Sequence, residues 1–196
     1  MDAPIVLASA SPRRAHILTG LRVPFRVVVP QVDESLRPGE APAELAERLA
    51  REKAAVVAAR EAAPVLAADT VVVCDGAVLG KPESAEEARR MLGRLQGREH
   101  EVLTGVCVVN AGRTHSGLDR TRVRFVALSD SEIDWYVATG EPLDKAGAYH
   151  VDGLGALFID RLVGSPSGVA GLPVRLLLEL ARAAGLDLGI ASTAGR

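Results

Sequence analysis

Short runs of Val, Ile and Leu alternate along the chain with segments of helical periodicity, a pattern typical of an α/β fold with a mixed β-sheet. The predicted strands cover residues 4–8, 25–29, 65–74, 99–109, 113–127 and 156–163. The predicted helices cover 12–20, 42–62, 84–96, 129–138 and 173–185. Neither a repeat nor a linker interrupts this order, so we predict that residues 1–196 form one domain.

The predicted helix 42–62 carries a charged residue on its apolar side. At 100° per residue, one arc of this helix is apolar; its members are Leu45, Ala46, Leu49, Ala50, Val56 and Val57. Lys53 lies in the middle of the arc, where an ammonium group needs a polar partner. Lys53 is therefore a candidate functional cation, with a lysine that extends its head to solvent as the alternative.

The predicted strand 65–74 contains one carboxylate, Asp69, among apolar residues. Burial of an unpaired carboxylate is costly unless a metal ion or a cation compensates it. Asp69 is therefore a candidate metal ligand or general base. The alternative is a structural aspartate that lies on an exposed bulge or accepts hydrogen bonds from N–H groups.

A turn with two hydroxyls and two guanidinium groups joins the first strand to the first helix. It reads Ser9-Ala10-Ser11-Pro12-Arg13-Arg14. Helix N-termini attract phosphate through their N–H groups, and arginine donates paired hydrogen bonds to phosphate oxygens. The turn therefore predicts a triphosphate site, although an ordinary helix start with solvated arginines has the same sequence pattern.

Two further segments add charged candidates. Lys81 lies between Gly80 and Pro82, and the proline restricts the backbone, but residues 76–81 lack the spacing and the hydroxyl residue of a P-loop. Asp33 and Glu34 follow the second strand, and one of them could complete a magnesium site with Asp69, because Mg²⁺ takes one or two carboxylates plus water and phosphate oxygens. A charged loop is otherwise simply solvated.

Composition excludes several other classes of function. The formal net charge of -2 and the 3% aromatic content disfavour binding to a nucleic-acid polymer and favour a small ligand. Neither a signal peptide nor a membrane-spanning segment is recognisable, so we expect a cytoplasmic protein without membrane contact. The two cysteines, Cys74 and Cys107, lack the spacing of a zinc site and are predicted to be buried.

Eight motifs, in order along the chain, resemble those of the Maf family of nucleoside triphosphate pyrophosphatases. They are LASASPRR at 7–14, VDES at 32–35, RLAREKA at 48–54, AADTVV at 67–72, LGKP at 79–82, HEVLTGV at 100–106, EPLDKAGAY at 141–149 and GLP at 171–173. The resemblance implies an elongated α/β fold, a mixed β-sheet flanked by helices with a cleft between two lobes, and in many members a homodimer. It also implies hydrolysis of a nucleoside triphosphate between the α and β phosphates, with release of pyrophosphate.

The same resemblance implies a role for each candidate residue. Asp69 would orient or deprotonate the attacking water, and Glu34 would hold Mg²⁺ or Mn²⁺ together with Asp69. The other catalytic residues would be Lys53 and Lys81, which bind phosphate. The remaining substrate-binding residues would be Ser9, Ser11, Arg13, Thr70 and Asp152.

Base choice in the family depends on positions that correspond here to Arg13, Thr70 and Asp152. The Asp69-Thr70 pair resembles the branch that acts on dTTP and UTP. That branch commonly has AYGIQG where this chain has AYHVDG at 148–153, so Asp152 stands in place of glutamine. An ionised aspartate only accepts hydrogen bonds, whereas glutamine also donates them. We therefore predict a dTTP/UTP preference that is relaxed or shifted.

A different class of function stays open at this point. Maf proteins are also associated with the inhibition of septum formation, so the alternative is a nucleotide-binding regulator with little catalysis. The presence of Glu34, Lys53, Asp69 and Lys81 favours the enzyme.

Overall fold

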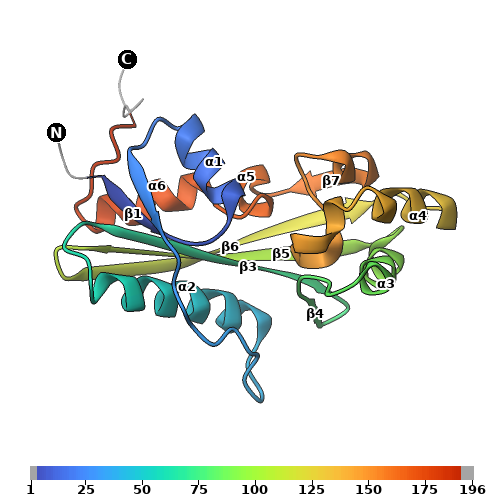
Figure 1. Cartoon of the computed structure of the whole chain (residues 1–196), viewed down its shortest axis with the longest axis horizontal. Helices are drawn as coiled ribbons and strands as arrows, with labels where there is room; N and C mark the ends of the chain where they lie inside the picture. Colours follow the sequence, from blue (N-terminus) through green and yellow to red (C-terminus); the bar gives the residue numbers. More distant parts are fainter. Residues whose placement is uncertain (1–3, 191–196) are drawn as a thin grey trace. The chain divides into compact units, whose positions relative to one another are not determined.

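The computed structural model describes residues 4–190, which form a seven-stranded mixed sheet with helices (Figure 1). The strands are β1 (Ile5–Ala8), β2 (Phe25–Val28), β3 (Val65–Cys74), β4 (Ala77–Leu79), β5 (Glu99–Asn110), β6 (Arg113–Phe125) and β7 (Ile159–Val163). Their order is β2-β1-β3-β5-β6-β7, with β4 paired to β3. Strand β1 pairs in parallel with β2 and β3, whereas the β3–β4 and β6–β7 pairs are antiparallel. The predicted α/β class with a mixed sheet is confirmed.

Six α-helices and three 3₁₀ helices accompany the strands within residues 4–190. The α-helices are α1 (Pro12–Gly20), α2 (Pro42–Ala58), α3 (Ala85–Leu95), α4 (Asp130–Ala138), α5 (Pro166–Val169) and α6 (Val174–Ala183). The 3₁₀ helices are η1 (Glu141–Asp144), η2 (Ala146–Ala148) and η3 (Leu154–Phe158). In this part of the chain, no helix combines the length and apolar composition needed to cross a bilayer.

Two predicted elements differ from the observed ones by three residues or more at one end. The strand predicted at 156–163 begins only at Ile159, because residues 154–158 form η3. A short apolar run does not distinguish a strand from a helical turn, and here the side chain of Phe158 packs into a core from the end of η3. Helix α2 ends at Ala58 instead of residue 62, and the short helix α5 was not predicted.

The chain divides into two compact units. Within the described residues, unit 1 comprises 4–69, 105–118 and 171–190, and unit 2 comprises 70–104 and 119–170. Strands β3, β5 and β6 contribute residues to both units. The boundary within β3 falls between Asp69 and Thr70. The buried hydrophobic clusters are confined to one unit or the other.

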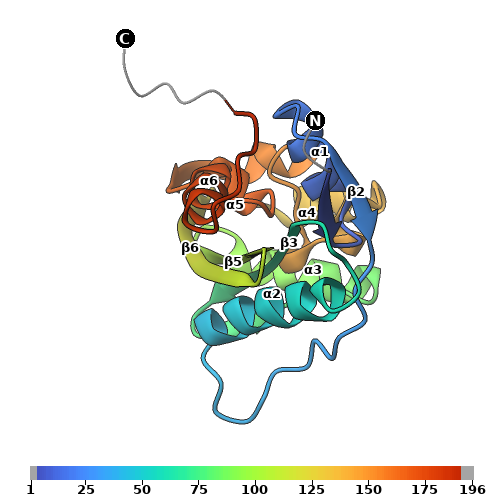
Figure 2. The same cartoon turned by 90° about the vertical axis from the view of Figure 1, so that its left-hand side faces the viewer.

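Unit 1 has a core on each face of its strands. Alternate residues of a strand point to opposite faces. In β3, Leu66 and Ala68 join the cluster that contains residues of α1 and α6, whereas Val65 and Ala67 join the cluster that contains residues of α2. Figures 1 and 2 show α1 and α6 on one face and α2 on the other. Asp69 follows Val65 and Ala67 in this alternation, so its side chain points to the same face, the one that α2 covers.

Unit 2 has a core built around edge-to-face aromatic contacts. Its rings belong to His100, Phe125, Tyr136, Tyr149 and Phe158. The Nε2 atom of His100 lies 3.0 Å from the hydroxyl of Tyr149. Its Nδ1 atom is buried and has no hydrogen-bond partner within residues 4–190. Burial lowers the pKa of His100 from 6.5 to about 4.

Acidification should therefore destabilise the chain through His100. The folded state keeps this imidazole neutral down to pH 4 or so, whereas the unfolded chain takes up a proton near pH 6.5. Stability then falls as the pH drops between these two values, and the loss from pH 7 to pH 5 should be about 2 kcal/mol. Urea denaturation at both pH values measures this loss. The loss of stability should be smaller in His100→Gln but unchanged in the exposed control His16→Gln. An equal loss in the wild type and both variants would contradict the role given to His100.

Candidate functional site

The centre of the candidate site is an ion pair between α2 and β3. The Nζ atom of Lys53 lies 2.5 Å from Oδ1 of Asp69, and the two residues are only 6% and 7% exposed. Both side chains belong to unit 1 and face each other because of the alternation in β3 and the apolar arc of α2. Lys53 therefore does not extend to solvent, and Asp69 has a buried cation as its partner.

Glu34 provides a second carboxylate to the same ammonium group. It lies in the loop between β2 and α2, and its Oε1 is 2.7 Å from Nζ of Lys53. The side chain of Glu34 is 60% exposed, so it reaches the pair from the solvent side. Asp33 instead accepts a hydrogen bond from the backbone N–H of Ser35 at 2.9 Å, which is a local turn interaction. Two carboxylates thus converge on one cation, with a summed formal charge of −1.

The turn that follows β1 is tied together by Ser9. Its Oγ accepts hydrogen bonds from Nη1 of Arg14 at 3.0 Å and from the backbone N–H of Ser11 at 3.1 Å. Arg14 also donates from Nε to the carbonyl of Gly171 at 2.8 Å, so it links the first motif to the GLP motif. Arg13 is half-buried beside it.

Arg14 belongs to the turn predicted as a triphosphate site, but the family resemblance assigned a role to Arg13 alone. Arg14 is 9% exposed, and burial lowers its pKa while the negative charge of Asp69 acts in the opposite direction. The charges of Arg13 and Glu34 also act on Arg14, so these groups lie within electrostatic reach of one another. The spacing of Arg14 and Leu18, the two buried residues of α1, is i to i+4 and could have shown that this arginine faces inward.

Three predicted site residues belong to unit 2. Thr70 is half-buried, and its Oγ1 lies 3.0 Å from that of Thr104, which in turn donates to the carbonyl of Gly168 at 2.9 Å. Lys81 is exposed just after β4. Asp152 is exposed in the turn before η3. The roles of these three residues stay predictions.

The turn that carries Asp152 is held by Glu141, a residue not selected from the sequence. The Glu141 carboxylate accepts hydrogen bonds from the Tyr136 hydroxyl at 2.7 Å and from the N–H groups of Leu154 and Gly155 at 3.1 and 3.0 Å. Burial acts to raise the pKa of Glu141, but these hydrogen bonds outweigh it and lower the pKa. Glu141 therefore stays ionised and fixes the backbone after Asp152.

The oxygen donors of the site fit a hard divalent cation. Within residues 4–190, no group of three or more His, Cys, Asp or Glu side chains is gathered tightly enough to hold a metal by itself. Glu34 and Asp69 nevertheless converge on a single positive charge. Two carboxylates are what Mg²⁺ commonly takes from a protein when substrate phosphates and water supply the other ligands. These two residues could therefore hold the metal.

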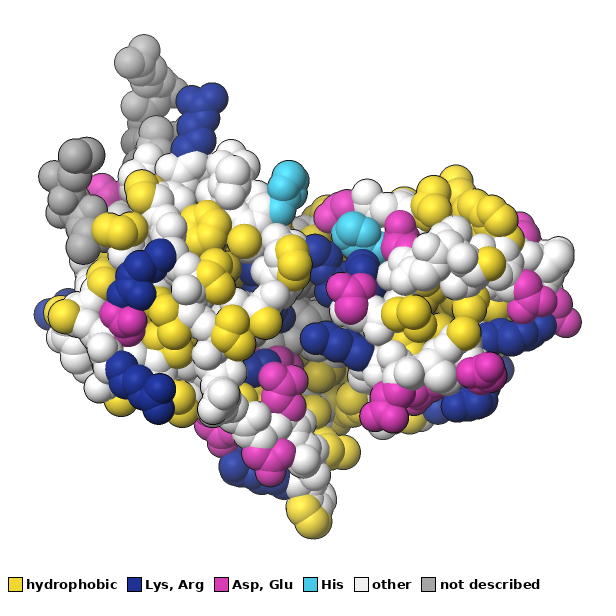
Figure 3. All heavy atoms as spheres, in the orientation of Figure 1, with side chains coloured by type: hydrophobic (Ala, Val, Ile, Leu, Met, Phe, Trp, Pro, Cys, Tyr) yellow, Lys and Arg dark blue, Asp and Glu magenta, His cyan; other side chains and the backbone are white. Residues whose placement is uncertain are grey.

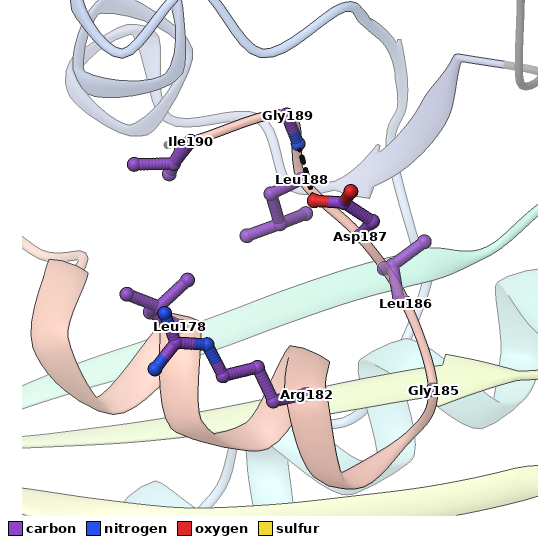
Figure 4. A pocket seen from close by; sticks show the side chains of 8 residues that line it. All are labelled: Leu178, Arg182, Gly185, Leu186, Asp187, Leu188, Gly189 and Ile190. Carbon is purple, nitrogen blue, oxygen red and sulfur yellow. Dashed lines mark hydrogen bonds between the residues drawn. The ribbon is translucent and has the colours of Figure 1, made fainter. Parts of the chain in front are cut away.

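A pocket of about 470 Å³ lies elsewhere in unit 1, between α6 and the segment that follows it (Figure 4). Its lining residues are Leu178, Arg182, Gly185, Leu186, Asp187, Leu188, Gly189 and Ile190. The carboxylate of Asp187 accepts a hydrogen bond from the N–H of Gly189 at 2.9 Å. None of these residues was predicted to belong to the site around Asp69.

The surface charge is mixed. On the face seen in Figure 3, acidic and basic side chains are interspersed, without a continuous basic field.

Comparison with known proteins identifies the family. The family model described as Maf-like protein matches residues 4–184. The chain is 49% identical over 177 residues to the dTTP/UTP pyrophosphatase of Symbiobacterium thermophilum, with 90% of this chain and 91% of the relative covered. It is 52% identical over 188 residues to the dTTP/UTP pyrophosphatase of Anaeromyxobacter dehalogenans, with 94% and 95% covered. The chain belongs to the Maf family.

A solved structure shares the fold. The Ham1 protein of Staphylococcus aureus superposes with a TM-score of 0.50 and 16% identity, over 91% of this chain and 89% of that one. At this identity the likeness concerns the fold alone.

Proposed function

We propose that this protein is a nucleoside triphosphate pyrophosphatase that hydrolyses dTTP and UTP to the monophosphate and pyrophosphate. One observation carries the proposal: two carboxylates, Glu34 and Asp69, converge on the buried ammonium of Lys53 in a chain of the Maf family. The names of the relatives at about 50% identity support the reaction and the substrates.

The charges of unit 1 suit a triphosphate. In phosphoryl transfer, catalysis consists mainly of positioning and of stabilising negative charge on the phosphate oxygens. Hydroxyls and guanidinium groups in the turn after β1, from Ser9, Ser11, Arg13 and Arg14, would bind these oxygens. The phosphate-binding role of Lys81 stays a prediction from the family resemblance.

Asp69 would act on the water molecule. A carboxylate accepts a proton from water, and proton transfer to a positioned base accelerates such reactions. The buried ion pair with Lys53 fixes the orientation of the Asp69 carboxylate. When bound by Glu34 and Asp69, Mg²⁺ or Mn²⁺ would neutralise phosphate charge. Lys53 would stabilise the same negative charge from the α2 side.

A panel of triphosphates with product identification tests this function. We expect dTTP and UTP to give the monophosphate and pyrophosphate in one step, measured by ion-exchange chromatography. Release of orthophosphate without pyrophosphate would overturn the proposal.

The same panel also tests base choice. Because Asp152 only accepts hydrogen bonds, dCTP should be hydrolysed at a measurable rate, and Asp152→Gln should reduce that rate relative to the rate with dTTP. A strict dTTP/UTP enzyme would disprove relaxed specificity. Homodimer formation and the cytoplasmic location stay predictions.

A further inference from the structure

Glu34 depends on contacts outside its own loop for its position. The segment between β2 and α2, residues 29–41, contains neither a helix nor a strand, only a turn at Pro38-Gly39. The Glu34 side chain is 60% exposed, yet its carboxylate is directed at Lys53. An exposed loop side chain loses conformational entropy when it is held in one orientation, so other contacts must offset that cost.

Those contacts come from Arg48 on α2. Its guanidinium group makes four hydrogen bonds: Nε and Nη2 donate to the two carboxylate oxygens of Glu40 at 2.5 and 2.9 Å, Nη1 donates to Glu52 at 3.0 Å, and Nη2 also donates to the carbonyl of Ser35 at 3.0 Å. The side chains of Arg48 and Glu40 are only 11% and 9% exposed. This is the bidentate geometry in which an arginine–carboxylate pair is strong.

Three of these hydrogen bonds fix the two ends of the loop segment 35–40, which directly follows Glu34. Ser35 is the residue next to Glu34, and Glu40 lies just before the start of α2. The hydrogen bond from Arg48 lowers the pKa of Glu40 to about 2. The anchor therefore stays charged at any pH suitable for an assay. On the same helix, Lys53 receives the Glu34 carboxylate, so one helix holds both the backbone and the side chain of this loop segment.

We propose that Arg48 is the positioning residue for the metal site: it holds residues 35–40 so that the Glu34 carboxylate faces Lys53 and Asp69. The proposal rests on the proposed function, in which Glu34 and Asp69 hold the divalent ion. Arg48 itself contacts neither metal nor substrate in this scheme. It acts through Glu34.

Binding of Mn²⁺ alone, without nucleotide, tests the proposal by electron paramagnetic resonance. Arg48→Gln should weaken Mn²⁺ binding about tenfold to a hundredfold, as is usual for residues that orient a metal ligand. Arg48→Lys should fall between this variant and the wild type, because lysine keeps the charge but not the planar fork. The matched control is Arg51→Gln on the same helix. Arg51 is exposed and forms an ion pair with Glu47, so this variant should bind Mn²⁺ like the wild type.

A double-mutant cycle separates positioning from general stability. In the Glu34→Gln background, Arg48→Gln should cause no further loss of Mn²⁺ affinity, because its effect passes through Glu34. Wild-type affinity in Arg48→Gln, or losses that add in the double variant, would overturn the proposal. If Arg48→Gln fails to fold, the same cycle with Arg48→Lys decides. If the wild-type protein binds Mn²⁺ but releases no pyrophosphate, the proposed function is refuted. The double-mutant cycle can still be read, because it measures only Mn²⁺ affinity.

Discussion

Replacing Asp69 by asparagine is expected to lower kcat for dTTP hydrolysis about a thousandfold, within the range attributed to a positioned general base. Asparagine has nearly the shape of aspartate. It keeps an oxygen that can accept the hydrogen bond that Lys53 donates to Asp69 at 2.5 Å in the wild type. The variant loses the negative charge and the ability to take a proton from water. Steady-state kinetics measure turnover, and calorimetry in the presence of Ca²⁺ measures nucleotide binding, which we expect to persist.

Asp33→Asn is the matched control for this variant. Asp33 lies next to Glu34 and accepts a hydrogen bond from the N–H of Ser35, and asparagine can accept the same bond. Its turnover should stay near that of the wild type. Full activity in Asp69→Asn would refute the catalytic role. A wild type that binds dTTP without hydrolysing it would favour the regulatory alternative.

Replacing Gly105 by alanine is expected to destabilise the protein by at least about 3 kcal/mol, the upper part of the range for overpacking. A Cβ atom at this position in β5 would lie 2.2 Å from the carbonyl oxygen of Ala46 and 2.8 Å from Cα of Glu47. Both atoms belong to the backbone of α2, so no side-chain rotation relieves the contact. The helix would have to move away from β5, and Arg48 and Lys53 would move with it.

Urea denaturation measures this loss, with Gly93→Ala as the matched control. Gly93 lies within α3, and a Cβ atom there meets no atom within 4 Å. The control should gain roughly 0.5–1 kcal/mol because alanine favours the helix. If Gly105→Ala were as stable as the wild type, the close approach of α2 to β5 would be disproved.

The periodic parts of the sequence were sufficient to predict much of the fold and the centre of the site. Strand β3 has the predicted bounds, 65–74, because its apolar run is long and ends at an Asp-Gly turn. The apolar arc of α2 placed Lys53 on the buried side, which its 6% exposure confirms. Alternation along β3 then directs Asp69 to the same side. These inferences required only the side-chain periodicity of a helix and of a strand.

Loop contacts could not be derived in this way. The sequence left Asp33 and Glu34 as alternatives, because a loop has no period that directs one side chain inward. In the structure Glu34 contacts Lys53, and its neighbour Ser35 contacts Arg48, whereas the role of Glu34 as a metal ligand stays a prediction. The hydrogen bonds of Glu141 to Leu154 and Gly155 also join residues far apart along the chain. Lys81 and Asp152 were selected chiefly through the family resemblance, and their roles stay predictions.

The buried ammonium of Lys53 also affects how the protein folds before any metal ion binds. Carboxylates that wait for a metal repel each other until it arrives, and many metalloproteins fold only as the ion binds. Here Lys53 already offsets part of the negative charge of Glu34 and Asp69 from within the chain. We therefore expect the chain to fold without the proposed divalent ion, so that removal of metal with a chelator would leave the free energy of unfolding near its original value.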